Sequence, residues 1–155
     1  MPPTISRQLR DEGLSVHEAG HAVSGIVLGL PVDRVWMGAD EGACHLREMR
    51  LSSPEEEARK LAIFYQAGQW AQYSFRRITT IRECCQTDDQ QYAEMLEELF
   101  QGQSYESQRR IVDDIAESVF DLVEEHKQSI MRVAEALRNA PSRALTGDEV
   151  RRLVF

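Results

Sequence analysis

The chain has 155 residues, of which 42% are hydrophobic and 28% are charged, and its net charge is −8. A chain of this length and composition buries enough apolar surface for a proper core, and we expect residues 1–155 to form a single domain. The negative charge disfavours nucleic acid and anionic membranes as main partners, because both reward clustered lysine and arginine.

The cysteines and the N-terminal residues favour a cytoplasmic location. The three cysteines, Cys44, Cys84 and Cys85, form no CxxC pair, so a thiolate zinc site is not expected. The N-terminal segment is polar and has no signal-peptide pattern, and no apolar stretch is long enough to span a membrane. The sequence therefore predicts a reducing, cytoplasmic setting and no membrane insertion.

The first half of the chain predicts a helix, a hairpin and a second helix. Apolar residues recur at helical spacing over residues 5–30. Two short β-rich runs follow, residues 32–38 and 43–49, and the acidic, glycine-containing turn between them indicates a small hairpin or sheet edge. Residues 52–75 form the second helix, because Ser53 is a favourable N-cap and is followed by a proline and three glutamates.

The second half of the chain predicts helices alone. Residues 76–87 are interpreted as a connection, and residues 88–100 as a third helix that Thr87 or Asp88 caps. An apolar stripe predicts a long helical region over residues 104–138, and a capping-box spacing near the C-terminus predicts a last short helix. Together the elements predict an α+β fold that is predominantly helical, with a small β-sheet or hairpin between the first and second main helices.

The first helix contains the motif HExxH, as His17-Glu18-Ala19-Gly20-His21. Histidines four residues apart lie on the same helical face, so their imidazoles can bind one zinc ion. Glu18 lies beside them, where it can take a proton from a water that the zinc activates. The small Ala19–Gly20 pair lets another segment pack against the helix between the two ligands. The motif therefore predicts a hydrolytic zinc site.

A structural alternative for the same residues is a capping box, because Ser15 and Glu18 have the S-x-x-E spacing. If the helix began at Ser15, Glu18 would cap its N-terminus and would not act as a base. The residues before Ser15 are compatible with a helix, which favours an upstream start and the catalytic interpretation.

Two histidines do not complete a catalytic zinc site, which needs a third protein ligand and an open position for water. The chain offers 26 acidic residues as candidates. The glutamates at 55–57 are typical of a solvated helix start, whereas Asp88 and Asp89 open a helix and can present a carboxylate inward. Spacing alone does not choose between these two aspartates.

Four segments in order resemble the peptidase domain of FtsH-type proteases. SVHEAGHAV resembles the zinc helix of that family, and QAGQWAQ, residues 66–72, is similar to its A-G-R-A-A-E helix. TDDQQYAEML is similar to the N-D-L-x-x-A segment, with Asp89 and Ala93 matching its Asp and Ala. Residues 122–154 resemble the C-terminal pattern of a long helix followed by L-x-G-x-E. The resemblance spans about residues 14–154, nearly the whole chain.

The resemblance implies a zincin-like metallopeptidase domain that binds Zn²⁺ and cleaves a peptide or protein substrate. The family's ligand set would fall on His17, His21 and Asp89, with Glu18 as the general base. Asp88 matches the family's Asn and would be a helix cap or a group behind the ligands. The family forms rings, so the resemblance also allows a homo-oligomer.

The family's edge strand beside the zinc matches Gly42, Ala43, Cys44 and His45, which the resemblance implies as substrate-binding residues. An edge strand can hold an extended peptide by main-chain hydrogen bonds. His45 would then face the site. The alternative for His45 is a partly exposed strand histidine with no role in the site.

The sequence also departs from the family. The membrane anchor and ATPase domain of FtsH-type proteases are absent from these residues, so ATP-driven unfolding is not implied and the expected hydrolysis is ATP-independent. Gln69, Trp70 and Gln72 replace small residues and an acid near the inferred site. The alternative function is therefore a catalytically weak or inactive zincin-like module that binds or regulates a protein. A zinc deaminase is disfavoured, because the H-x-E and CxxC motifs of that class are absent.

Overall fold

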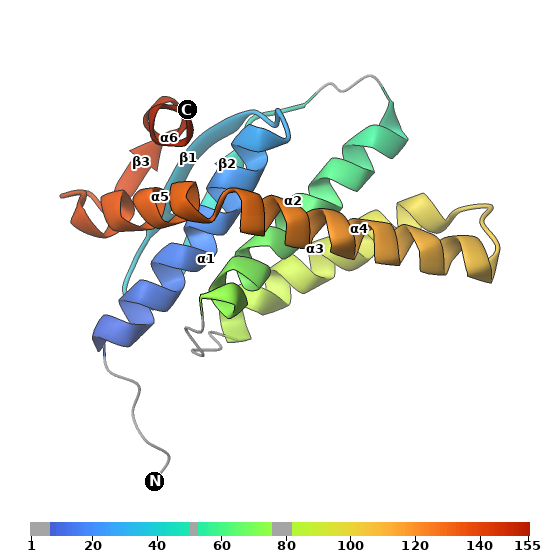
Figure 1. The fold of residues 1–155 in the computed structure, drawn as a ribbon, viewed down its shortest axis with the longest axis horizontal. Helices are drawn as coiled ribbons and strands as arrows, with labels where there is room; N and C mark the ends of the chain where they lie inside the picture. Colours follow the sequence, from blue (N-terminus) through green and yellow to red (C-terminus); the bar gives the residue numbers. More distant parts are fainter. Residues whose placement is uncertain (1–6, 50–52, 76–81) are drawn as a thin grey trace, which may run out of the picture.

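A computed structural model of the chain describes residues 7–49, 53–75 and 82–155 (Figure 1). The described residues are predominantly helical and contain a small antiparallel sheet, as the sequence predicts. In chain order the elements are α1 (Arg7–Val27), β1 (Val32–Met37), β2 (Gly42–Leu46), α2 (Pro54–Ser74), α3 (Arg82–Phe100), α4 (Tyr105–Glu125), α5 (Lys127–Asn139), β3 (Ala144–Thr146) and α6 (Gly147–Val154).

Helix α1 is the central element of the fold. It packs against α2, α5, β1 and α6, and every residue from 13 to 26 is buried. The helix ends where Gly29 adopts a φ of +75°, a left-handed conformation that glycine tolerates. The motif histidines therefore lie in the interior, on the most buried helix of the molecule.

The capping alternative for Glu18 is wrong, because α1 already includes Arg7 and Ser15 lies in its interior. The Ser15 hydroxyl donates to the backbone carbonyl of Glu12 at 2.9 Å and does not accept from the Glu18 amide. Glu18 is thus free of any capping role at the helix start.

The sheet has the strand order β2-β1-β3, with both neighbours antiparallel to β1. The β1–β2 hairpin is confirmed, and its register pairs Val35 with Cys44 and Met37 with Gly42. Strand β3 is a finding of the structure, because its three residues give no strand pattern of their own. β2 lies at one edge of the sheet, and among the described residues no other strand pairs with its outer side.

The start of α2 is as predicted, since the Ser53 hydroxyl accepts from the Glu56 amide at 3.1 Å. The start of α3 is not. The helix includes Arg82, so the expectation of a connection up to residue 87 is wrong for residues 82–87, and neither Thr87 nor Asp88 is a cap. The rest of the expected connection, residues 76–81, lies outside the described residues. Asp88 consequently projects from within a helix, which fixes its direction.

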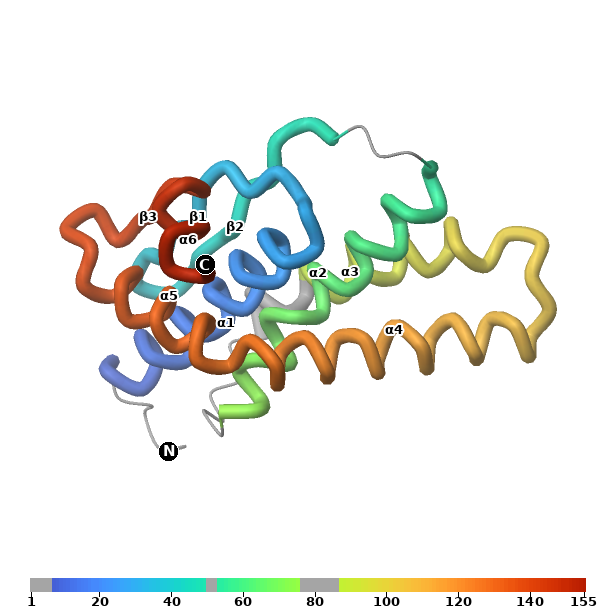
Figure 2. Tube along the Cα trace, turned by 45° about the horizontal axis from the view of Figure 1, so that its top comes forward, coloured from blue at the N-terminus to red at the C-terminus, as the bar shows by residue number. Residues whose placement is uncertain are grey.

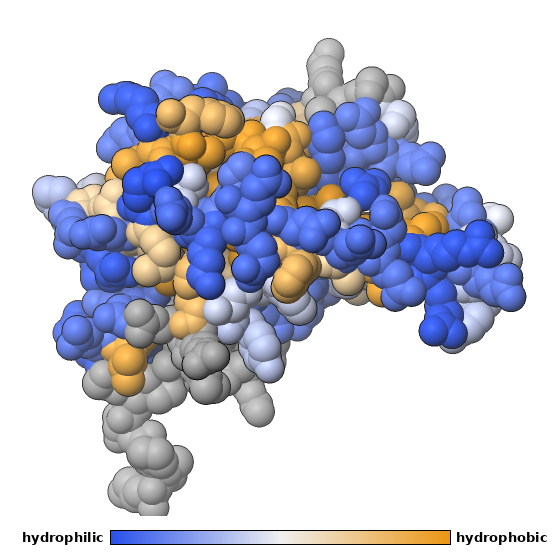
Figure 3. Space-filling view, viewed as in Figure 1, coloured by the Kyte–Doolittle hydropathy of each residue, from blue (hydrophilic) through white to orange (hydrophobic). Residues whose placement is uncertain are grey.

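The long helical region divides into two helices at His126, whose φ of −105° and ψ of 20° interrupt the regular helix. The predicted capping box at the start of α6 is confirmed, because Thr146 and Glu149 bond each other's backbone amides reciprocally. Figures 1 and 2 show α3 and α4 as an antiparallel helical hairpin whose turn lies far from the sheet. Hydrophilic side chains cover much of α4 on the face drawn in Figure 3.

None of the helices in the described part of the chain is long and apolar enough to cross a membrane. The hydrophobic core contains side chains from α1, from the sheet and from the helices that pack against α1. Its least exposed members include Val23, Val35, Ile63, Ile130 and Leu137. This packing holds α1 rigidly between the sheet and the helices, and so fixes the site that α1 carries.

Candidate metal centre

Three potential ligand atoms meet between α1 and α3. His17 Nε2 and His21 Nε2 each lie 2.9 Å from Asp88 Oδ2, and the two nitrogens lie 3.1 Å apart. Ligands of a tetrahedral zinc ion with bonds of about 2.0–2.1 Å are separated by about 3.3 Å. The triangle is therefore close to the size that a zinc ion requires, and a small outward movement of each ligand would complete it.

The outer nitrogens of both imidazoles are hydrogen-bonded by α2. His17 Nδ1 donates to Gln72 Oε1 at 3.1 Å, and His21 Nδ1 donates to the Phe64 carbonyl at 2.8 Å. A proton on each Nδ1 leaves the lone pair of each Nε2 directed at the centre, which is the usual arrangement behind metal-binding histidines. Three potential donors thus converge, and they could hold a metal ion between them.

The electrostatics of the ion-free chain show the same demand for positive charge. Burial acts to lower the pKa of His21, but the Asp88 carboxylate, Glu18 and the Phe64 carbonyl together outweigh burial and raise that pKa to about 9. Burial acts to raise the pKa of Asp88, but His21 and His17 outweigh it and hold that pKa well below its usual range. A proton shared in this way occupies the position that suits a divalent cation.

Two glycines let α1 and α2 approach closely at this level. A Cβ atom on Gly68 would lie 2.4 Å from His21 Nε2 and 2.8 Å from the His17 carbonyl. A Cβ atom on Gly20 would lie 2.8 Å from the Ala67 carbonyl. The expectation that small residues allow close packing between the two ligands is confirmed. Any larger side chain at position 68 would displace the His21 imidazole.

Glu18 lies on the opposite side of the ligands from α2, under the sheet. Its side chain is 2% exposed, and a Cβ on Gly42 would lie 2.9 Å from its Cγ. Its Oε2 is buried and has no hydrogen-bond partner among the described residues. Burial raises the pKa of this carboxyl, although His21 and His17 partly oppose the rise. A buried carboxylate oxygen without a hydrogen-bond partner lowers the stability of the fold. Its presence therefore indicates a functional role for Glu18.

The structure corrects the sequence expectation for the third carboxylate. Asp88 lies between the histidines, whereas Asp89 is exposed on the outer face of α3. Consecutive helical residues point about 100° apart, so only one of the two aspartates can face α1. The sequence carries no signal for this choice, because the half-buried residues Tyr92, Met95 and Leu96 lie at helical spacing from both aspartates.

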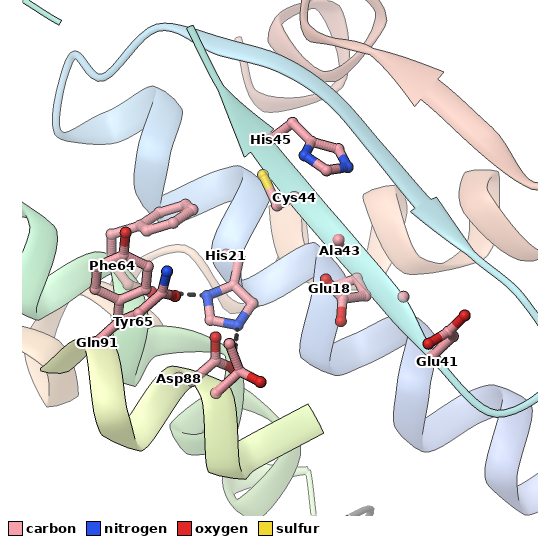
Figure 4. Close-up of a pocket in the computed structure, with 12 residues that line it drawn as sticks. Glu18, His21, Glu41, Ala43, Cys44, His45, Phe64, Tyr65, Asp88 and Gln91 are labelled. Atoms are coloured by element: carbon pink, nitrogen blue, oxygen red, sulfur yellow. Dashed lines mark hydrogen bonds and ion pairs between the residues drawn. The ribbon is translucent and has the colours of Figure 1, made fainter. Parts of the chain in front are cut away.

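A pocket of about 390 Å³ opens beside these residues (Figure 4). β2 forms one wall, and side chains from α1, α2 and α3 form the others. Its lining residues are Glu18, His21, Glu41, Gly42, Ala43, Cys44, His45, Phe64, Tyr65, Thr87, Asp88 and Gln91. The four strand residues that the resemblance implies for substrate binding are all included.

Cys44 and His45 lie on opposite faces of β2, since strand side chains alternate. Cys44 faces the core, and burial raises the pKa of its thiol. His45 is exposed and accepts a hydrogen bond from Trp36 Nε1 at 3.0 Å. His45 is therefore an exposed strand histidine, as the alternative interpretation predicted. It borders the pocket because of its place on β2, and its imidazole bonds Trp36.

Comparisons of the chain with known proteins assign no family: a scan of protein-family models and a search of curated proteins both find no match.

Two groups that contribute to the centre were not identified from the sequence. Gln72 was expected only as a departure from the family, yet its amide holds His17. The Phe64 carbonyl is a main-chain group, which no residue pattern reveals.

Proposed function

We propose that this protein is a zinc-dependent metallopeptidase whose metal ligands are His17, His21 and Asp88. The observation that supports this most is the convergence of three electron-pair donors next to a buried carboxylate, Glu18, that has an oxygen with no partner. The pocket beside an edge strand supplies a place for an extended peptide. This is the composition of a hydrolytic zinc site in a zincin-like domain.

The donor set suits zinc. Two neutral imidazoles and one carboxylate are nitrogen and oxygen ligands that Zn²⁺ prefers, and three protein ligands leave a fourth position for water or substrate. When bound, zinc would polarise the scissile carbonyl and lower the pKa of an attacking water towards about 7. The hydrogen bonds of Gln72 and the Phe64 carbonyl would hold both imidazoles in the required tautomer.

The remaining steps fall to groups of the chain itself. Glu18 would accept the proton of the attacking water and pass it to the leaving amine. Its burial raises its pKa, which makes it a stronger base than an exposed glutamate. The free edge of β2 would align the peptide by main-chain hydrogen bonds, so that the cut bond lies over Gly42 and Glu18.

The test combines metal content with cleavage. Protein purified without chelator should contain one zinc per chain and cleave members of a mixed peptide library. The variant Glu18→Gln should keep the zinc and lose cleavage, whereas Glu98→Gln on the exposed face of α3 should behave as the parent does. Cleavage by Glu18→Gln at the parental rate would show that the mechanism is wrong.

A peptide-binding module is the second candidate, and the same edge strand favours it. Its main-chain groups can hold a peptide whether or not a bond is cut. Zinc in the parent with peptide binding but no cleavage of any library member would favour this module over the peptidase.

A further inference from the structure

The pocket beside the candidate centre has two chemically different ends (Figure 4). Phe64 and Tyr65 of α2 and Gln91 of α3 gather at one end. Glu41, on the turn that leads into β2, lies at the other end, and Glu18 lies between them. A ligand that crosses the reacting groups therefore contacts both ends.

The end near α2 is aromatic. The Phe64 ring is 3% exposed, and its centroid lies 5.2 Å from that of His21 and 5.3 Å from that of Tyr65. Tyr65 is half-buried and lines the pocket beside it. Packed rings of this kind form a preorganised apolar surface that favours a large apolar or aromatic side chain.

The end near the hairpin turn is acidic. Asp40 forms an ion pair with Arg10, whereas the neighbouring Glu41 is exposed and forms no ion pair among the described residues. Deeper in the same pocket a bound Zn²⁺ would offset the charges of Glu18 and Asp88, so Glu41 supplies the unbalanced negative charge of this end. This end consequently attracts a cationic side chain, with a contribution that salt will screen.

The spacing along β2 relates these two ends to the reacting groups. Gly42 lies directly over Glu18, with Glu41 one residue before it and Cys44 two residues after it. A strand rises about 3.3 Å per residue, and a peptide paired with β2 advances by the same amount. A side chain at the acidic end and one at the aromatic end thus belong to residues on opposite sides of the bond above Glu18.

We propose, on the basis of the proposed peptidase function, that the substrates are peptides with a lysine or arginine on the Glu41 side of the cut bond and a large aromatic or aliphatic residue on the Tyr65 side. Glu41 selects the cation and Tyr65, above Phe64, selects the apolar residue. The two selections are independent, because they act at opposite ends of the pocket.

The experiment uses the full zinc-loaded chain and a set of equal-length fluorescent peptides. The set carries Lys and Phe in both orders around a neutral centre, with Glu replacing Lys and Ala replacing Phe in the controls. Cleavage is measured with the parent, and binding is measured by fluorescence anisotropy with Glu18→Gln. We expect one Lys/Phe order to be preferred, by about 3-fold over the Glu control and at least about 10-fold over the Ala control.

Matched variants assign the two preferences. Glu41→Lys should invert the charge preference, and Glu48→Lys, an equal charge change beyond the far end of β2, should leave it intact. Tyr65→Ala should remove most of the aromatic preference, and Tyr73→Ala, an 80% exposed tyrosine on the same helix, should not. Raising the salt to about 1 M should abolish only the charge preference.

The outcomes separate this inference from the proposed function. Cleavage that shows no difference between Glu41→Lys and Glu48→Lys, or between Tyr65→Ala and Tyr73→Ala, would overturn the inference and leave the peptidase standing. Discrimination in binding without any cleavage by the parent would support the two-ended pocket and refute the peptidase. Equal binding of all peptides to Glu18→Gln would overturn the inference as well.

Discussion

Gly68→Ala should uncouple zinc binding from the rest of the fold. The added Cβ would lie 2.4 Å from His21 Nε2 and 2.6 Å from its Cδ2, both far inside van der Waals contact. The third close neighbour is the His17 carbonyl at 2.8 Å, which is backbone and cannot rotate away. The imidazole of His21 must therefore move, and its Nε2, the atom closest to the clash, is the proposed zinc ligand.

The magnitude follows from opposing contributions. Alanine is favoured over glycine in a helix by about 1 kcal/mol, whereas overpacking in a tight interior costs about 1–3 kcal/mol. We expect a net loss of up to about 2 kcal/mol in the free energy of unfolding without metal. If displacement of His21 weakens zinc affinity about 100-fold, zinc at 100 times the parental Kd would stabilise the parent by about 2.7 kcal/mol and the variant by only about 0.4 kcal/mol.

The assay is urea unfolding with and without zinc, so that each variant gives a zinc-free stability and a zinc-dependent increment. Gly20→Ala is the matched control, because its Cβ would meet the Ala67 carbonyl and Ala71 Cβ at 2.8 Å, both on α2. Gly20→Ala should lower the zinc-free stability with a smaller effect on the increment. A parental increment in Gly68→Ala would refute the reasoning.

Three further predictions address the charges and hydrogen bonds of the centre. Asp88→Asn should weaken zinc binding by more than about 100-fold and Asp89→Asn should not, as measured by competition with a chromophoric chelator; equal affinities would contradict the ligand choice. Gln72→Ala removes the acceptor behind one imidazole and should weaken zinc binding about 10–100-fold in the same titration, while parental affinity would show that this hydrogen bond is dispensable. The zinc-free protein should lose stability as the pH rises from 6.5 to about 9, because the raised pKa of His21 makes its stabilising contribution complete below 6.5 and absent above about 9. The decrease in the free energy of unfolding with pH, measured by urea unfolding, should be smaller in Asp88→Asn. A free energy of unfolding that does not change over this pH range in the parent would refute the stabilising role of the charged His21.

The helices of this fold could be predicted because their signals are local. The Ser53 cap, the capping box at Thr146 and the apolar stripe of α1 depend on residues within a few positions of one another. β3 could not be predicted, because three residues gain strand conformation only by pairing with β1. The beginning of α3 was predicted too late, because Thr87 and Asp88 are favourable cap residues that lie inside a continuous helix.

Within the centre, the histidines and the glutamate could be predicted because one helical turn fixes their relation. The carboxylate comes from another helix, and its identity depends on how α3 is rotated about its own axis. Asp88 and Asp89 are equally acidic and adjacent, so composition does not distinguish them. The apolar residues of α3 do not distinguish them either, because Tyr92, Met95 and Leu96 lie at helical spacing from both, so only the folded structure shows that Asp88 faces α1.

The helix that supplies no ligand has the largest influence on the centre. α2 holds the outer nitrogen of both histidines through Gln72 and the Phe64 carbonyl, and Gly68 lets it come close enough to do so. Without those two acceptors a neutral imidazole could carry its proton on Nε2 and donate it to Asp88, so that its Nε2 lone pair would be lost to a metal. Because α2 accepts the Nδ1 protons, Nε2 is the nitrogen of each imidazole that is left to bind a metal ion or, on His21, the proton shared with Asp88. If the centre binds zinc as proposed, the groups that orient its two histidines lie on α2, outside the HExxH motif.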